Sequence, residues 1–411
     1  MGRNRKSKRK KANGSGNNPG QAYNHFIKAL YVLLGKYNAQ KSYVYLSNEE
    51  KRYIYAFRWV VPVPVAAEGH DVSQAQLKRI GKYIQMYLRT DSHKFREVML
   101  TAYELQVLYS FVLVINQFIS SDSRREFLCQ KFPFVRTMGD LIDDVGILYL
   151  CNFLKVSTSL SCVNSRHYAL NFRFGSLVKD NPVFEMIPQV SSYPAQSKVI
   201  PINGIERRVF RLGASYSRGK VRFYRLRAGV LGNHYKGRNE SVEVYIQSHA
   251  LNRLNERLDL LDEPGLNYSL WDNTENMKGF EFYRGYLLLP FRLYEIKIGY
   301  LAANVVKGVL VFRTFLFITH SSTPEGDRLK EITGLEKNDI SYWRLDRLST
   351  LLQADAEKYP GLMELFEQAG MGEILQLREK NLDLQSMQSA NFERFMDYIQ
   401  QGQNESVVEE L

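Results

Sequence analysis

The helix-forming stretch Ser248–Leu258, which reads SHALNRLNERL, decides our interpretation of this chain because its residues separate onto two faces. At 100° per residue, one side carries the leucines, and the other carries His249, Arg253, Glu256 and Arg257. Histidine titrates near neutral pH, and arginine is the best side-chain partner of a phosphate oxygen. This polar face therefore suits phosphate chemistry. An ordinary amphipathic helix with a solvated face has the same pattern.

Length and composition predict a multidomain protein of the cell interior. A chain of 411 residues exceeds what one core usually supports, so we expect two or three domains. Its three cysteines, Cys129, Cys151 and Cys162, form no metal-binding or disulfide pattern, which favours a reducing compartment. No secretory signal opens the chain, and polar residues interrupt its longest apolar run, Tyr103–Ile119. We therefore expect a cytoplasmic protein with no membrane partner.

Positive charge is concentrated at the N-terminus. Seven Lys or Arg lie within the first eleven residues, which hold no acidic residue, and supply most of the net charge of +12, among them Lys6, Lys8, Arg9, Lys10 and Lys11. The polar composition predicts a disordered basic tail over residues 1–19. Such a tail either binds nucleic acid by releasing counterions or only keeps the protein soluble. An acidic tail is expected at residues 403–411.

A second basic block lies inside the folded part. Residues 205–240 hold ten Lys or Arg against two acidic residues. Read as one strand, residues 221–227 place Phe223, Arg225 and Arg227 on one face and Arg222, Tyr224 and Leu226 on the other. Arginines interleaved with aromatic rings predict a surface for single-stranded nucleic acid, with Arg222, Tyr224, Arg225 and Arg227 as contacts. An edge strand guarded by charge fits the same residues.

The order of elements predicts an α+β fold. Residues 20–155 are typical of a helical domain, with helices near 21–36, 74–88, 92–119 and 137–154 and a capping box at Ser47 to Glu50. Residues 156–320 become β-rich, with expected strands at 168–177 and 199–212. Thr323-Pro324-Glu325 then predicts the start of a C-terminal helical region over residues 321–402. We expect these regions to follow one another as separate domains.

Three further strands are expected after the Ser248 helix, at 285–289, 291–300 and 308–318. Period-two alternation in the last one puts Arg313 and Thr319 on one face and Thr314 and His320 on the other. Polar groups thus occur on both faces, and the sequence does not decide which face meets the helix. We expect Arg313 to be a further nucleic-acid contact.

The motif His-Ala-x-x-Arg-x-x-Glu-Arg, followed by antiparallel strands, resembles the small metal-independent ribonuclease fold of the barnase, colicin and RelE toxin group. The resemblance covers about residues 220–320. It implies that His249 is a catalytic histidine, that Arg253 binds phosphate, and that Thr314 or Thr319 supplies the hydroxyl of the last strand. Arg257, the last residue of the motif, is included among the expected catalytic residues. This chain departs from the group where residues 258–261 continue the helix and where a longer insertion runs through Lys278.

Two functions therefore compete. The first is a metal-independent endoribonuclease, a toxin or defence effector, that cleaves RNA by attack of the 2′-hydroxyl and is held in check by an inhibitor protein. The second is a non-catalytic protein that binds RNA or other nucleic acid through the same basic surfaces. No phosphate-binding loop, nucleophile elbow or His-Glu-x-x-His motif is present, so neither a metal nor a cofactor is expected.

Overall fold

The computed structural model describes residues 19–95, 97–130, 138–175, 184–216, 219–275, 277, 279–353 and 360–380. The basic tail with Lys6, Lys8, Arg9, Lys10 and Lys11 lies outside these residues. So do the acidic tail and the helix expected between residue 380 and Gln401. The fold is α+β, as the sequence predicted.

The chain forms two compact units, each built from separate stretches of sequence. Unit 1 comprises Met1–Val63, Gly81–Asn152 and Phe172–Pro188, and unit 2 comprises Pro64–Ile80, Phe153–Asn171 and Gln189–Leu411. Apart from the boundary at Val63/Pro64, which lies between β1 and β2, the boundaries fall inside helices and strands. The units are therefore not the successive domains that the sequence led us to expect.

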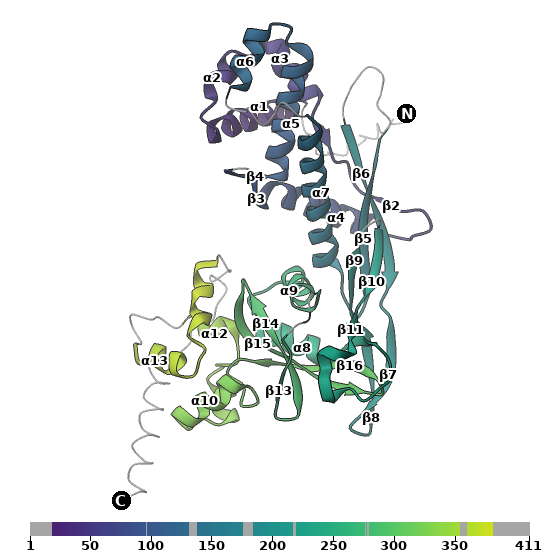
Figure 1. The fold of residues 1–411 in the computed structure, drawn as a ribbon, viewed down its shortest axis with the longest axis vertical. Helices are drawn as coiled ribbons and strands as arrows, with labels where there is room; N and C mark the ends of the chain where they lie inside the picture. Colours follow the sequence, from purple (N-terminus) through teal and green to yellow (C-terminus); the bar gives the residue numbers. More distant parts are fainter. Residues whose placement is uncertain are drawn as a thin grey trace, which may run out of the picture. The chain divides into compact units, whose positions relative to one another are not determined.

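Unit 1 is helical. Its core is α5 (Ala102–Phe118), whose residues from Leu105 to Ile115 are all buried. A helix that is apolar all round must be enclosed, and α1 and α3 pack against α5. The other helices with residues in this unit are α1 (Pro19–Lys36), α2 (Gln40–Val44), α3 (Asn48–Ala56), α4 (Gln74–Thr90), α6 (Asp122–Cys129) and α7 (Met138–Leu160), of which α4 and α7 continue into unit 2 (Figure 1).

Capping boxes set two helix starts in unit 1. The predicted box at α3 is confirmed, since the Ser47 hydroxyl accepts from the Glu50 N–H and the Glu50 carboxylate accepts from the Ser47 N–H. A second box joins Thr101 and Glu104 and starts α5 at Ala102. The helix expected from residue 92 is therefore wrong in its first turns. A hairpin of β3 (Ser92–Phe95) and β4 (Val98–Thr101) stands there instead.

Unit 2 contains an eight-stranded sheet in the order β13-β14-β15-β16-β12-β8-β7, with β11 also paired to β12. Neighbouring strands are antiparallel except β12 and β16, which run parallel. The strands are β7 (Ser197–Ile202), β8 (Ile205–Arg211), β11 (Arg225–Arg227), β12 (Ser241–Gln247), β13 (Glu281–Tyr283), β14 (Tyr286–Leu293), β15 (Ile296–Val306) and β16 (Val309–Phe317).

Smaller sheets complete the strand set. Besides the β3–β4 hairpin, one contains β5 (Arg166–Phe174), β6 (Phe184–Pro194) and the short strands β1 (Trp59–Val60) and β2 (Val65–Ala66), which pair parallel to β6. Another is the hairpin of β9 (Gly213–Tyr216) and β10 (Lys220–Phe223). The single strand expected over residues 221–227 is wrong. Tyr224 interrupts it, and β10 and β11 pair with different partners.

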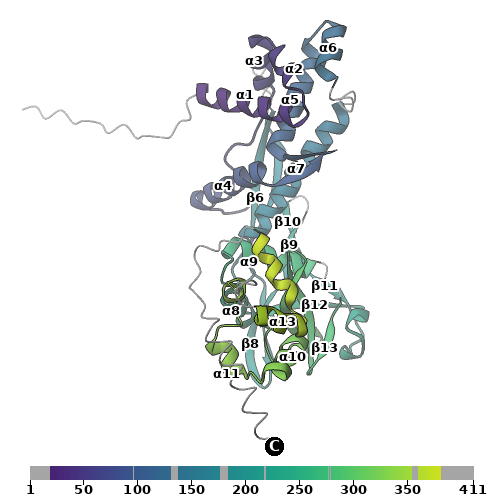
Figure 2. The same ribbon diagram turned by 90° about the vertical axis from the view of Figure 1, so that its left-hand side faces the viewer.

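Helices cover one face of the large sheet (Figure 2). Their apolar residues share one core with Leu310, Phe312 and Phe315 of β16, so the C-terminal helices belong to this unit. These helices are α8 (Ser248–Arg257), α9 (Glu263–Glu275), α10 (Pro324–Thr333), α11 (Lys337–Tyr342), α12 (Leu348–Leu352), α13 (Pro360–Gln368) and the 3₁₀ segment η4 (Gly372–Lys380); a further segment, η3 (Ala228–His234), follows β11. The N-cap predicted at Thr323 is confirmed, because its hydroxyl accepts from the Gly326 N–H.

Several boundaries differ from the sequence reading. The run over residues 199–212 is a hairpin that turns at Asn203-Gly204, both with positive φ. Pro290 lies within β14, and the next turn comes at Tyr294-Glu295. α8 ends at Arg257, capped by Leu258, so the expected continuation of the helix is wrong. The insertion after it holds α9.

Candidate functional site

The position of α8 follows from the length of β12. The last described pair between β12 and β16 is Ile246 with Phe312, and α8 begins at Ser248. β16 runs on to Phe317, and α8 packs against it there. Ala250, Leu254 and Leu258 are buried in the core, as the apolar face of the helix predicted. His249 and Arg253 are left on the side that faces away from this core.

A β-bulge fixes which side chains of β16 reach the site. Ala303 pairs with Phe312 and Ala302 with Thr314, so Arg313 is an extra residue in its strand. The bulge brings Phe315 onto the same face as Phe312, within the main core. Thr314 shares the opposite face with Ala302 and Tyr300. Strict alternation across residues 309–320 was therefore wrong after Phe312.

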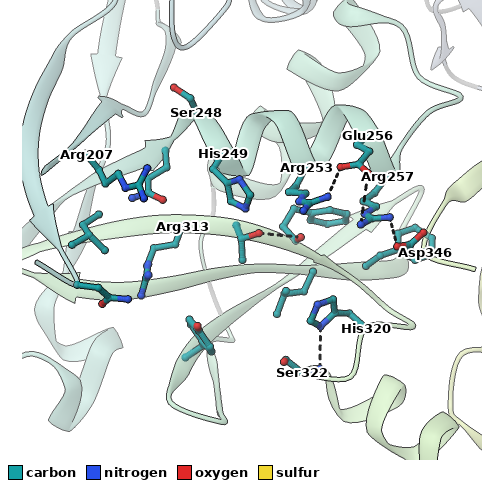
Figure 3. A pocket seen from close by; sticks show the side chains of 18 of the residues that line it. Arg207, Ser248, His249, Arg253, Glu256, Arg257, Arg313, His320, Ser322 and Asp346 are labelled. Atoms are coloured by element: carbon teal, nitrogen blue, oxygen red, sulfur yellow. Dashed lines mark hydrogen bonds and ion pairs between the residues drawn. The ribbon is translucent and has the colours of Figure 1, made fainter. Parts of the chain in front are cut away.

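These elements enclose a cleft of about 930 Å³ (Figure 3). Its walls are one face of α8 along its whole length, the β7–β8 hairpin, the second half of β16, and the chain from His320 through α11 to Asp346. Cations outnumber acids along it: Arg207, Arg208, Arg253, Arg257, Arg313 and Lys337 face Glu206, Glu256 and Asp346. The balance favours an anionic ligand.

His249 is an exposed imidazole in this cationic cleft. Burial and the charges of Arg253 and Arg207 lower its pKa below the ordinary 6.5, against the opposing effect of Glu256. The ring is therefore largely neutral at pH 7 and able to accept a proton. Figure 3 shows it projecting from α8 on the same side as Arg253, with Arg207 and Arg313 near its end of the cleft.

An ion-pair network holds the far end of α8. Arg253 pairs with Glu256, and Arg257 pairs with Asp346 and Glu256. Arg347 adds a contact to Glu256 at 3.3 Å. Burial would raise the pKa of Glu256, but the surrounding arginines outweigh it and hold that pKa below its usual value. Burial raises the pKa of Asp346, although Arg257 opposes it. Arg257 thus joins α8 to the segment before α12.

The two threonines have different surroundings. Thr314 is half-buried and lines the cleft. Thr319 is 1% exposed, and its hydroxyl donates to the Leu345 carbonyl oxygen at 2.9 Å. The structure therefore places only Thr314 where a ligand could reach it. Arg313 also lines the cleft, and its Nη1 donates to the Asn304 side chain at 3.0 Å.

The second basic block is divided: Arg207 and Arg208 line the cleft, whereas the arginines of residues 221–227 lie apart from its lining. Arg222 forms an ion pair with Glu275, and Arg225 donates to the Ser241 hydroxyl at 3.0 Å. Arg227 is exposed on β11. Tyr224 is 6% exposed and packs in the core, so the expectation that it stacks on a base is corrected. The arginines remain a basic surface without the predicted aromatic platform.

Sequence reasoning missed His320, which also lines the cleft. Its Nδ1 accepts the Ser322 N–H at 3.1 Å, which leaves the hydrogen of the neutral ring on Nε2. Burial, with Lys337, Arg257 and Arg253, lowers its pKa to about 4. The available signal was its position between the last strand and the turn residues Ser321-Ser322-Thr323. Arg207 and Lys337 were missed because both lie far from the motif in sequence.

The fold and cleft define an α+β protein with a cationic, histidine-bearing site. In the described part of the chain, no helix is long and apolar enough to cross a membrane. Nor do three or more His, Cys, Asp or Glu side chains gather there in a way that would hold a metal ion. Comparison with protein-family models, with curated proteins and with solved structures gives no match.

Proposed function

We propose that the cleft binds an RNA backbone and that His249 initiates its cleavage without a metal ion. The observation that carries the proposal is the exposed His249 imidazole, held toward its neutral form beside Arg253 and Arg207. A neutral imidazole at neutral pH is a competent general base. The surrounding guanidinium groups would bind the phosphate and so place it next to the His249 base.

The proposed reaction is an intramolecular transesterification. Neutral His249 removes the proton of the ribose 2′-hydroxyl, and the 2′-oxygen forms a bond to the adjacent phosphorus. The bond from phosphorus to the 5′-oxygen breaks, and that oxygen takes a proton from water in the open cleft. The products are a 2′,3′-cyclic phosphate and a free 5′-hydroxyl. Arg253, Arg207 and Arg313 stabilise the added negative charge, and the Nε2–H of His320 donates to a phosphate oxygen.

The test is incubation of labelled RNA with the purified protein in excess chelator. His249→Ala should abolish cleavage, a loss of roughly 10² to 10⁴ in rate, while RNA binding changes little. Arg253→Ala should weaken both binding and cleavage. His234→Ala is the matched control, because this exposed histidine lies outside the cleft lining. Full cleavage by a folded His249→Ala protein would end the assignment.

A second candidate, nucleic-acid binding without chemistry, has its own supporting observation. Arg253 and Arg257 already pair with acidic side chains, whereas Arg227 is an exposed cation of the β11 surface. RNA that is retarded but intact in the assay above would favour it. Changing Arg222, Arg225 and Arg227 together to Gln should then weaken binding more than the removal of three scattered surface lysines.

A further inference from the structure

A second cavity lies wholly within unit 1 and has no part in the proposed reaction. It measures about 230 Å³ and is formed where α1, α3, α4, α5 and α7 meet β1. This is roughly the space of eight water molecules, which admits a small molecule and excludes a folded partner. Two arginines, Arg58 and Arg89, line it together with the aromatic side chains of Tyr55, Trp59 and Tyr103.

Each arginine is positioned on a tyrosine ring. The Arg58 guanidinium lies 3.8 Å from the Tyr55 ring centroid, and its Nη1 donates to the Tyr55 carbonyl oxygen at 2.8 Å. The Arg89 guanidinium lies 4.3 Å from the Tyr103 ring centroid. These contacts orient the planar groups and leave most of their N–H donors unused. Stacked arginines are thus pre-organised for an incoming anion.

Both arginines line the same cavity and act on one of its phenols. Burial raises the pKa of the Tyr103 phenol, and the charges of Arg89 and Arg58 both oppose that rise. No Asp or Glu lines the cavity, and neither arginine has an acidic partner within ion-pair distance among the described residues. Arg58 is half-buried and Arg89 is exposed, and two like charges that line one cavity favour an anion between them.

We propose that this cavity binds a small organic anion, with its phosphate or carboxylate head between Arg58 and Arg89 and a flat body against the rings of Tyr55 and Trp59. Arginine forks match both head groups in a bidentate manner. The aromatic walls, including the buried ring of Trp59, provide the apolar contact for the body. This site is independent of the His249 cleft, which belongs to unit 2.

The test is calorimetric titration of the full-length protein with orthophosphate, benzoate, adenosine monophosphate and uncharged adenosine. We expect at least one anion to bind saturably and adenosine not to bind. Arg58→Gln and Arg89→Gln should each raise the dissociation constant about tenfold or more, since each removes charge-assisted hydrogen bonds. Arg52→Gln is the matched control, because Arg52 is an exposed arginine of α3 outside the cavity.

Clear outcomes overturn the proposal. It fails if no anion binds more tightly than about 1 mM, if adenosine binds as well as its monophosphate, or if Arg52→Gln weakens binding equally. Arg89→Lys guards against misfolding, because it keeps the charge but removes the fork. That variant should fold and still bind the anion that the unaltered protein binds, with a smaller loss of affinity than Arg89→Gln. RNA cleavage should be unchanged in all these variants, so this proposal and the proposed function fail separately.

Discussion

His167 is a buried histidine with no hydrogen-bond partner on either ring nitrogen among the described residues. Burial lowers its pKa to about 4. Between pH 6.5 and 4, the unfolded chain therefore binds a proton that the folded chain does not. Stability is full above this window and is lost as pH falls through it, by about 2 kcal/mol for this residue between pH 7 and 5.

We therefore expect His167→Leu to make unit 2 less sensitive to acid. Chemical unfolding at pH 7 and pH 5 measures this, and the variant should lose about 2 kcal/mol less than the unaltered protein on acidification. His320 supplies part of the remaining loss, since its pKa is also about 4. The exposed His234→Ala variant should behave like the unaltered protein. Equal acid sensitivity in His167→Leu would contradict the assignment.

Thr314 lines the cleft and Thr319 is buried, so substitutions at the two positions should have different effects. Thr319→Val leaves the Leu345 carbonyl without its donor, so the free energy of unfolding should fall by about 1–3 kcal/mol with catalysis retained. Thr314→Val should leave stability nearly unchanged and alter RNA binding or turnover, because its side chain lines the cleft. Denaturant midpoints and RNA assays on both variants show which threonine affects stability and which affects activity. The opposite pattern would place the functional hydroxyl at Thr319.

The first helical turn of α10 packs closely against the backbone of His320. A Cβ at Gly326 would lie 2.0 Å from the His320 carbonyl oxygen, so only glycine fits there. Gly326→Ala should displace this turn, cost about 1–3 kcal/mol of stability and reduce activity in the cleft. Unfolding and RNA cleavage are measured together. Gly308→Ala is the control: it meets no atom within 4 Å, and its positive φ costs about 1 kcal/mol without touching the site.

Elements whose ends are fixed by hydrogen bonds between neighbouring residues could be predicted from the sequence. Elements whose bounds depend on pairing with a strand distant in sequence could not. The Ser47 capping box and the Thr323 N-cap follow from side chains that satisfy their own helix. The bulge at Arg313 carries no Gly or Pro, because the pairing with β15 imposes it. Tyr294-Glu295 turns with positive φ without the usual Asn or Gly. For the same reason, the motif identified His249 and Arg253 but not His320, which only the fold brings to the cleft.

At the scale of the whole molecule, we expect the basic N-terminal residues to affect nucleic-acid binding through their positive charge. Deleting residues 1–11 removes seven cations. If these cations neutralise phosphates of a single strand, the slope of log affinity against log salt should become shallower by on the order of 0.7 for each phosphate left unneutralised. Binding measured across a salt series tests this. An unchanged slope would reduce the segment to a solubilising tail, and thermal unfolding should be the same in either case.

The two units cannot be separated by a single cut. α4, α7, β5 and β6 each contribute residues to both, so no single cleavage point yields two fragments that each hold one complete unit and nothing of the other. Truncations at residue 155 or 320, where the sequence suggested boundaries, would divide a compact unit. Substitutions in the full chain are therefore the better probe of either site.

The parallel pairing of β12 with β16 has a consequence for protein synthesis. One wall of the cleft is complete by Arg257, but the facing wall needs β16, His320 and Asp346. A nascent chain cannot form the cleft until the ribosome has translated past Asp346. Under the proposed function, this delay would keep the growing polypeptide inert beside its own messenger during most of translation.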